Sequence, residues 1–278
     1  MIENPSLEIL GLPAFNDNYI WLLRAGGHLA VVDPGDAAPV IDFLKHRSDT
    51  LCAILLTHHH GDHVGGVDEI LNYCRTVTPF TPNIPVFGPA AEHIACVSHP
   101  LTGSETIHIA ELAAQFQVIP VPGHTRGHIA YYREAADPQH AGQLFCGDTL
   151  FGAGCGRLFE GSPAQMLDSL TRLTVLPAPT LVYCAHEYTQ SNLRFALAVE
   201  PDNVAIQERA RKVAIDRAAG IATIPTTLGV ERETNPFLRS DCPSVRAAAA
   251  LRLGLPIGRP STNALETFTA IREWKNVF

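Results

Sequence analysis

Short apolar runs alternate with amphipathic stretches along the first two-thirds of the chain. The runs are rich in branched and aromatic residues and stop at Gly, Pro, Asp or His, which predicts β-strands. The predicted strands are YIWLLRA (19–25), HLAVVDPG (28–35), LCAILLTH (51–58), FQVIPVPGH (116–124), HIAYYRE (128–134), QLFCGDT (143–149) and TLVYCAH (180–186). The helices predicted between them are 38–46, 64–75 and 163–176. This alternation predicts an α/β body.

After His186 the pattern becomes helical, rich in Ala, Leu, Arg and Glu, with no convincing strand. The predicted helices are 190–199, 203–219, 243–253 and 262–276. We therefore predict a body at 1–186, followed by a small all-helical C-terminal domain at 187–278.

Composition restricts the partners of the chain. A formal net charge of −8 over 278 residues argues against nucleic-acid binding, which needs a cationic surface. No run of 18 apolar residues occurs and no basic-then-apolar start is present, so we expect neither a membrane span nor a signal peptide. The 7 cysteines form no C-x-x-C pair and fit reduced thiols. We expect a cytoplasmic monomer without nucleic-acid or membrane partners.

One segment concentrates metal-binding chemistry. LLTHHHGDHVGG (55–66) places four histidines and one aspartate within six positions. Imidazole and carboxylate are the ligands that zinc and similar divalent ions accept. Three more donors follow predicted strands, where sites of layered α/β proteins gather. The candidate metal ligands are His58, His60, Asp62, His63, His124, Asp148 and His186. Seven donors exceed one tetrahedral zinc and suit two divalent ions that share a carboxylate.

Other polar residues near these segments have weaker signals. We expect His59 to point away from its neighbours, as a solvated or supporting residue, and His128 to orient a neighbour rather than bind metal. Asp33 has two interpretations, a turn aspartate or a hydrogen-bond partner of a ligating imidazole. A loose surface metal binder is the alternative for residues 58–63, but the three strand-end donors disfavour it.

The motifs THHHGDHVGG, PGHTRGH, FCGDTLF and AHEY together resemble those of the metallo-β-lactamase superfamily. Within it, AFNDNYIWLL, AGCGRLFEG and TNPFLR resemble the hydroxyacylglutathione hydrolases, the glyoxalase II family. The resemblance implies a four-layer αββα sandwich followed by a helical domain. It also implies a first metal held by His58, His60 and His124, a second held by Asp62, His63 and His186, and a bridging Asp148.

The resemblance further implies hydrolysis of S-(2-hydroxyacyl)glutathione, typically S-D-lactoylglutathione, in methylglyoxal detoxification. Asp62 and Asp148 would be catalytic together with a metal-bridging hydroxide. Two divalent ions are expected, zinc first, with iron or manganese as alternatives. The matched substrate-binding positions are Arg157, Tyr188 and Arg239. Phe159 stands where some relatives carry a tyrosine, so that hydroxyl would be missing.

The chemistry of the donors independently favours a thioester. A single zinc can lower the pKa of a bound water to about 7, the ions also polarise a carbonyl, and a thiolate leaves without much protonation. No Gly-x-Ser-x-Gly elbow offers a serine route. Three alternatives remain: another hydrolase or a persulfide dioxygenase of the superfamily, a non-catalytic metal-binding module, and a thiol redox protein. The full second-metal set disfavours a one-iron site, and no cysteine has a reactive setting.

Overall fold

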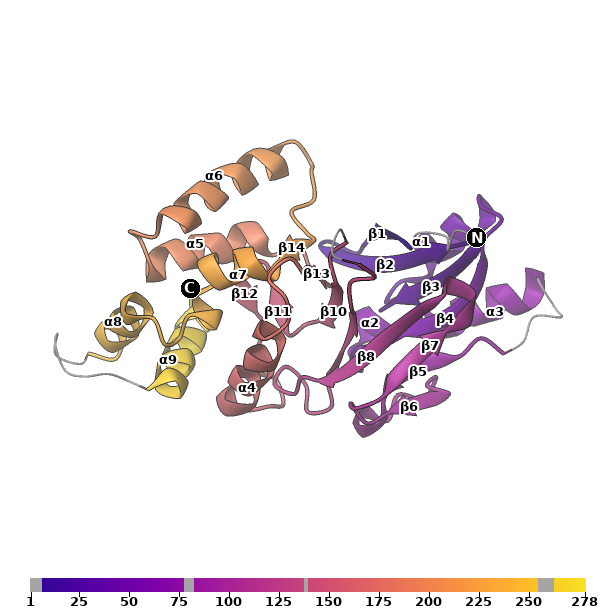
Figure 1. Cartoon of the computed structure of the whole chain (residues 1–278), viewed down its shortest axis with the longest axis horizontal. Coiled ribbons are helices and arrows are strands. Elements are labelled where there is room, and N and C mark those ends of the chain that lie inside the picture. The colour runs from indigo at the N-terminus through magenta and orange to yellow at the C-terminus, as the bar shows by residue number, and fades with distance from the viewer. Residues whose placement is uncertain (1–6, 78–82, 138–139, 255–262) are drawn as a thin grey trace.

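Two β-sheets lie face to face in the computed structural model, which describes residues 7–77, 83–137, 140–254 and 263–278 (Figure 1). The first sheet contains, in spatial order, β1 (Glu8–Ala14), β2 (Asn18–Ala25), β3 (His28–Val32), β4 (Thr50–Leu55), β5 (Val86–Pro89) and β6 (His99–Leu101). The second contains β14 (Thr226–Thr227), β13 (Leu181–Cys184), β10 (Gln143–Gly147), β9 (Ile129–Arg133), β8 (Ala114–Pro120) and β7 (Thr106–Ile109). A separate pair consists of β11 (Leu150–Phe151) and β12 (Gly154–Cys155).

The apolar runs are long because the central strands are buried on both faces. In β2, Trp21 and Leu23 belong to the same core cluster as Phe145 of the second sheet. The alternate residues Ile20 and Leu22 belong to a different cluster, formed with the helices outside the first sheet. Because successive side chains point to opposite faces, a strand covered on both sides reads as a continuous hydrophobic run.

Helices cover the outer faces of this sandwich. The helices before residue 186 are α1 (Ala37–Lys45), α2 (Gly61–Val64), α3 (Val67–Val77) and α4 (Pro163–Thr174), with the 3₁₀ turns η1 (Ala90–Glu92) and η2 (Ala110–Leu112). The outer side of the first sheet packs against α1 and α3. Helix α4 begins at a capping box between Ser162 and Gln165, and its Ser169 donates to the carbonyl of Pro122. The layers are therefore helix, sheet, sheet, helix.

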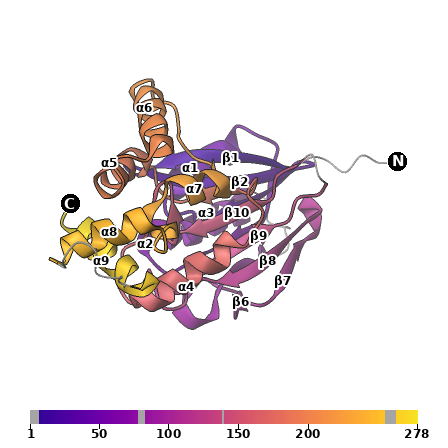
Figure 2. The same cartoon turned by 60° about the vertical axis from the view of Figure 1, so that its left-hand side comes forward.

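Among the described residues after position 186, the regular elements are helices and one strand, β14. Its helices are α5 (Thr189–Val199), α6 (Val204–Ala218), α7 (Leu228–Thr234), η3 (Pro236–Leu238), α8 (Pro243–Arg252) and α9 (Ala264–Asn276). They gather at the end of the molecule away from α1 and α3 (Figure 1), and Figure 2 shows α5, α6, α8 and α9 together on one side of the sheets. Position 262, the predicted start of the last helix, lies outside the described residues. No helix in the described ranges has the length and apolar composition needed to cross a bilayer.

A buried carboxylate joins three segments where the helices meet the sheets. Glu231 of α7 is fully buried and accepts hydrogen bonds from Ala153 N at 2.8 Å and from Asn235 Nδ2 at 3.0 Å. Its other oxygen accepts from Thr226 Oγ1 at 3.0 Å and from the Arg209 guanidinium at 2.6 Å. A buried charge of this kind is tolerated because every lone pair finds a donor.

Replacing Glu231 by Ala should destabilise the protein, because it leaves the Arg209 guanidinium, only 11% exposed, without its partner. We expect a loss of about 3–5 kcal/mol in the free energy of unfolding. Denaturant titration of the full chain measures it. The matched control is Glu233→Ala, an exposed position on the same helix, which should change stability by less than about 0.5 kcal/mol. Equal stability of the two variants would contradict this role.

Candidate active site

The predicted metal ligands lie in segments that follow four strands at one edge of the sandwich. Strand β4 leads to the segment carrying His58 to His63, and β8 leads to His124. Strand β10 leads directly to Asp148, and β13 leads to His186. The structure brings all seven predicted ligands together in neighbouring clusters at this edge.

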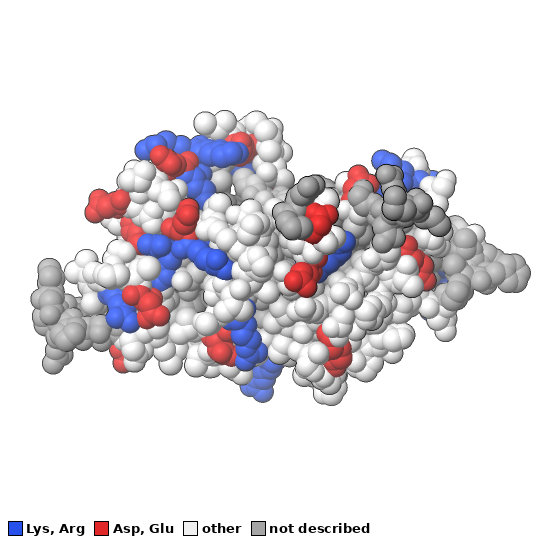
Figure 3. Space-filling model, in the orientation of Figure 1, with Lys and Arg blue, Asp and Glu red and all other residues white. Residues whose placement is uncertain are grey.

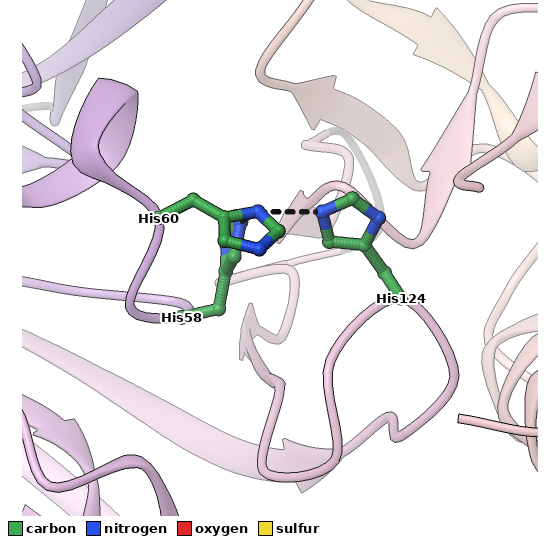
Figure 4. A group of neighbouring side chains, drawn as sticks. All are labelled: His58, His60 and His124. Atoms are coloured by element: carbon green, nitrogen blue, oxygen red, sulfur yellow. Dashed lines mark hydrogen bonds between the residues drawn. The ribbon is translucent and has the colours of Figure 1, made fainter. Parts of the chain in front are cut away.

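The first cluster contains three imidazoles, drawn in Figure 4. His60 Nδ1 lies 3.1 Å from His58 Nε2 and 3.0 Å from His124 Nε2. Nitrogens bound tetrahedrally to one zinc lie roughly 3.3 Å apart, given Zn–N distances of about 2.0–2.1 Å. Burial lowers the pKa of all three histidines, most strongly that of His58, so their lone pairs are available at neutral pH. The cluster therefore fits one divalent ion.

The second cluster contains Asp62, His63 and His186. The Asp62 carboxylate lies 3.5 Å from His186 Nε2 and 3.6 Å from His63 Nε2. His63 and His186 are buried, whereas the Asp62 side chain is 42% exposed. This set offers one carboxylate and two imidazoles to a second ion, with an open side toward solvent.

Asp148 lies between the two clusters. Its Oδ1 is 3.2 Å from His186 Nε2 and 3.4 Å from His63 Nε2, and its Oδ2 is 3.4 Å from His124 Nε2. Burial alone would raise the pKa of Asp148, but His63 and His186 hold it well below its ordinary value, so the group is a carboxylate. Asp148 Oδ1 and His63 Nε2 are buried without a hydrogen bond to any described residue. Buried polar atoms without a partner indicate a ligand, and a pair of ions bridged by Asp148 would satisfy both atoms.

Two residues that sequence reasoning missed hold the second cluster. Asp17 Oδ1 lies 2.8 Å from His186 Nδ1, and Asn18 Nδ2 donates to Asp62 Oδ2 at 3.1 Å. Both belong to the AFNDNY motif, whose polar residues at the start of β2 are the signal that could have pointed to them. Partners of this kind fix the orientation of a ligand and the tautomer of an imidazole.

Asp33 and His128 support ligands without belonging to the donor clusters. Asp33 accepts from Thr57 N at 2.8 Å and Thr57 Oγ1 at 2.7 Å, and its Oδ2 lies 3.0 Å from His63 Nδ1. Both interpretations find support: Asp33 has φ +50° at a turn, and its carboxylate lies within ion-pair distance of the His63 imidazole. His128 is fully buried, and its Nε2 accepts from the backbone N–H of Asp148 at 3.1 Å.

Glycines directly before two ligands allow this crowding. Gly147 precedes Asp148 with φ +46°, and a Cβ there would lie 2.3 Å from Thr57 Oγ1. Gly123 precedes His124 with φ +154°, and a Cβ there would lie 2.8 Å from α4. A side chain at either position would displace the ligand that follows it.

A cavity of about 650 Å³ opens beside His124 and Asp148 and extends toward the C-terminal helices. Its cationic lining residues are Arg157, Arg194, Arg272 and Lys275, and its aromatic ones are Phe151, Phe159, Tyr188 and Phe278. The Tyr188 ring stacks on the His186 ring, with centroids 4.8 Å apart. Phe159, 63% exposed, places its ring edge-on to His60 and His124. The cavity thus combines apolar walls with positive charge.

The structure brings Arg157 and Tyr188 to this cavity but not Arg239. Arg239 lines a different cavity, of about 1110 Å³, and its guanidinium binds the buried Glu200 carboxylate at 2.8 and 3.0 Å. The motif match for Arg239 thus corresponds to a structural ion pair in this chain. Arg272 and Lys275, which the sequence analysis did not consider, line the cavity instead. The sequence pattern that could have pointed to them is the presence of two cationic residues within the last helix.

Comparisons with known proteins agree with this architecture. A family model described as metallo-beta-lactamase superfamily matches residues 14–186, and one described as hydroxyacylglutathione hydrolase C-terminus matches residues 187–278. The chain is 50% identical over 275 residues to the hydroxyacylglutathione hydrolase of Pseudomonas fluorescens, covering 98% of this chain and 100% of the relative. The chain belongs to the hydroxyacylglutathione hydrolase family. A second member, from Photobacterium profundum, is 47% identical, with 98% and 100% coverage.

Solved structures place this hydroxyacylglutathione hydrolase family member in the same fold. The BLEG-1 B3 metallo-beta-lactamase aligns with a TM-score of 0.57 and 26% identity, over 84% of this chain and 99% of the other. TTHA1623 in a di-iron-bound form aligns with a TM-score of 0.53 and 27% identity, over 83% and 100%.

Replacing Asp148 by Ala should remove metal and turnover together, because it deletes the carboxylate shared by both clusters. Loss of an outer partner of a ligand costs about 10–100-fold, so we expect a loss of more than about 100-fold in turnover here. Elemental analysis and thioester kinetics of the purified protein measure both. His140→Ala, an exposed histidine paired with Asp137, is the control and should keep the native metal content. Full metal content in Asp148→Ala would rule out the bridge.

Proposed function

We propose that this chain hydrolyses S-(2-hydroxyacyl)glutathione, typically S-D-lactoylglutathione, to glutathione and a 2-hydroxy acid such as D-lactate. The observation that carries the proposal is the opening of the paired donor clusters into a cationic cavity walled by aromatic rings. The curated relatives that cover the whole chain are named hydroxyacylglutathione hydrolases, which supports the same substrate class. The activity belongs to methylglyoxal detoxification.

We assign two divalent ions to the seven donors, the first to His58, His60 and His124 and the second to Asp62, His63 and His186, with Asp148 shared. Zinc is the ion we propose, because the donor set suits it; iron and manganese accept the same ligands. The di-iron form of TTHA1623 supports the iron alternative. When bound, the ions supply a water of lowered pKa and a Lewis acid for the thioester carbonyl.

The protein's own residues hold and orient the reactants. Asp62 and Asp148 supply two negative charges against the four positive charges of two divalent ions, while the histidines are neutral ligands. With both ions bound, the metal centre would keep a net positive charge next to the carbonyl on which negative charge develops. The glutathione thiolate leaves with little protonation, so no general acid is required at the sulfur.

The cavity binds the peptide part of the substrate in this proposal. Glutathione carries two carboxylates, which the Arg157 guanidinium and the Lys275 ammonium complement. The Tyr188 hydroxyl adds a neutral donor. Phe159 contributes an apolar wall and no hydroxyl at the cavity mouth. Arg239 is left out of this substrate site, because its guanidinium is occupied by Glu200.

We further propose a cytoplasmic monomer without nucleic-acid or membrane partners. Cys146, Cys155 and Cys184 are buried free thiols, which suits a reducing compartment. On the face seen in Figure 3, basic and acidic residues of the described chain are interspersed rather than gathered into one basic surface. Such a surface offers little to a polyanion.

Steady-state kinetics test the function. Arg157→Ala should raise KM more than it lowers kcat, because a contact remote from the scissile bond is similar in the ground and transition states. We expect kcat/KM for S-D-lactoylglutathione to fall by roughly 10- to 150-fold, the range for a charge-assisted hydrogen bond. Thioesters of leaving groups without carboxylates should be poor substrates and insensitive to the change. Equal losses on both substrate types would contradict glutathione recognition by Arg157.

The pH dependence of substrate binding should report Lys275. Burial lowers the pKa of Lys275 to about 8, so its ammonium is charged below that pH and loses its charge as the pH rises through it. We expect kcat/KM to fall by about tenfold between pH 7 and 9.5, the cost of one charge-assisted hydrogen bond. Lys275→Arg, which stays charged, should abolish this alkaline fall. Superimposable pH profiles of the two proteins would exclude Lys275 from substrate binding.

A further inference from the structure

A buried carboxylate outside the donor set contacts both loops of the first metal cluster. Glu92 is the last residue of η1, and its side chain is only 2% exposed. Its Oε2 accepts from the backbone N–H of His59 at 2.6 Å and lies 2.8 Å from His59 Nδ1. His59 sits between the ligands His58 and His60, so this oxygen holds the loop after β4.

The other carboxylate oxygen holds the second loop. Glu92 Oε1 accepts from the Thr125 hydroxyl and from the backbone N–H of Gly127 at 3.0 Å. Thr125 directly follows the ligand His124 along the chain. One rigid carboxylate group thus spans the gap between the two loops that supply the three imidazoles.

We propose that Glu92 is a positioning residue that sets the spacing of the imidazoles of the first metal site. The proposal rests on the metal ligands assigned under the proposed function. Without Glu92, the loop after β4 and the loop after β8 lose their shared anchor, the buried carboxylate that bonds directly to both of them, and His124 is held less firmly relative to His58 and His60. The 3.0 Å approach of His60 and His124 depends on that anchor.

The hydrogen-bond donors around Glu92 require a side chain that accepts at both of its terminal atoms, as a carboxylate does. Glu92 Oε1 faces the Thr125 hydroxyl and the Gly127 N–H, and Oε2 faces the His59 N–H and, in the tautomer protonated at Nδ1, the His59 ring as well. A glutamine would turn its NH₂ group toward one of these pairs and meet donors with donors. An aspartate is shorter by one methylene and reaches only one loop. Glu92→Gln therefore removes half of the anchor while keeping the size of the side chain.

In this proposal His59 contributes to the site through its contact with Glu92 and is not a metal ligand. Its Nδ1 faces Glu92, and its Nε2 lies 3.2 Å from Glu160 Oε1. Glu160 in turn accepts from the backbone N–H of Arg126 at 3.2 Å, in the loop of His124. The ring is thus held between two carboxylates, and it packs edge-on against the His60 ring with centroids 4.9 Å apart.

The matched control is a second carboxylate that accepts several hydrogen bonds. Glu105 accepts from Thr102 N at 2.8 Å, from Gly103 N at 2.8 Å and from Ser104 N at 2.9 Å, all within its own turn. These contacts hold the pKa of Glu105 at about 2, chiefly through its bond from the Thr102 hydroxyl. Glu105→Gln disrupts a similar set of bonds that does not touch a metal loop.

The experiment compares full-length native, Glu92→Gln and Glu105→Gln protein. Zinc affinity is measured by competition with a chromophoric chelator, and the ligand field by the visible absorption of the cobalt-substituted proteins. We expect Glu92→Gln to bind zinc about 10- to 100-fold more weakly, the usual effect of losing an outer partner, and to show a shifted cobalt spectrum. Glu105→Gln should keep the native zinc affinity, cobalt spectrum and kcat, whatever its thermal stability.

Native zinc affinity and an unshifted cobalt spectrum in folded Glu92→Gln would overturn the proposal. If Glu92→Gln does not fold, Thr125→Val decides, since it removes one donor to Glu92 and keeps the shape of the side chain; a shifted cobalt spectrum supports the anchor and a native one overturns it. A native chain that binds metals but hydrolyses no glutathione thioester contradicts the proposed function alone. A native chain that binds no metal contradicts both.

Discussion

The position of one carboxylate determines how the rest of the site is built. Asp148 lies within 3.4 Å of imidazole nitrogens from three different loops, and its buried Oδ1 has no hydrogen bond. A buried charge is tolerated only where opposite charge meets it, and two divalent ions, one in each cluster, would supply that charge on either side of Asp148. The sheets therefore have to deliver their strand ends to one edge. Gly147 provides the backbone turn that brings Asp148 to this place.

The two parts of the chain divide the chemistry between them. Strand ends of the sandwich carry the metal ligands, whereas helices after residue 186 supply Lys275 and Tyr188 to the cavity. The parts are joined structurally as well, since β14 pairs with β13 and Glu231 bonds the turn after β11. A metal centre of the superfamily thus gains a cationic cavity from the helical part, which is what selects a glutathione thioester in our proposal.

Local patterns predicted much of this structure, and contacts between distant segments account for what they missed. Seven strands of the sandwich (β2, β3, β4, β8, β9, β10 and β13) and the helices α4 to α6 lie close to their predicted ranges, because doubly buried strands and capped amphipathic helices leave strong local signals. The apolar pattern did not predict β1, β5, β6 and β7. The two-residue β14 is too short to show a period. Asp17, Asn18 and Glu92 contact residues 33 to 169 positions away in or beside the metal-ligand loops, a relation invisible in single segments. Arg239 matched a substrate-binding position of the motif, yet its guanidinium forms an ion pair with Glu200.

Anomalous diffraction from crystals of the metal-loaded protein tests the central claim most directly. Data collected on both sides of the absorption edge of the bound metal locate each ion independently of any assumption about its ligands. The account predicts two anomalous peaks, one among His58, His60 and His124 and one among Asp62, His63 and His186, about 3.5–4 Å apart with Asp148 between them. A single peak in crystals of fully active protein, or two peaks that Asp148 does not join, would contradict it.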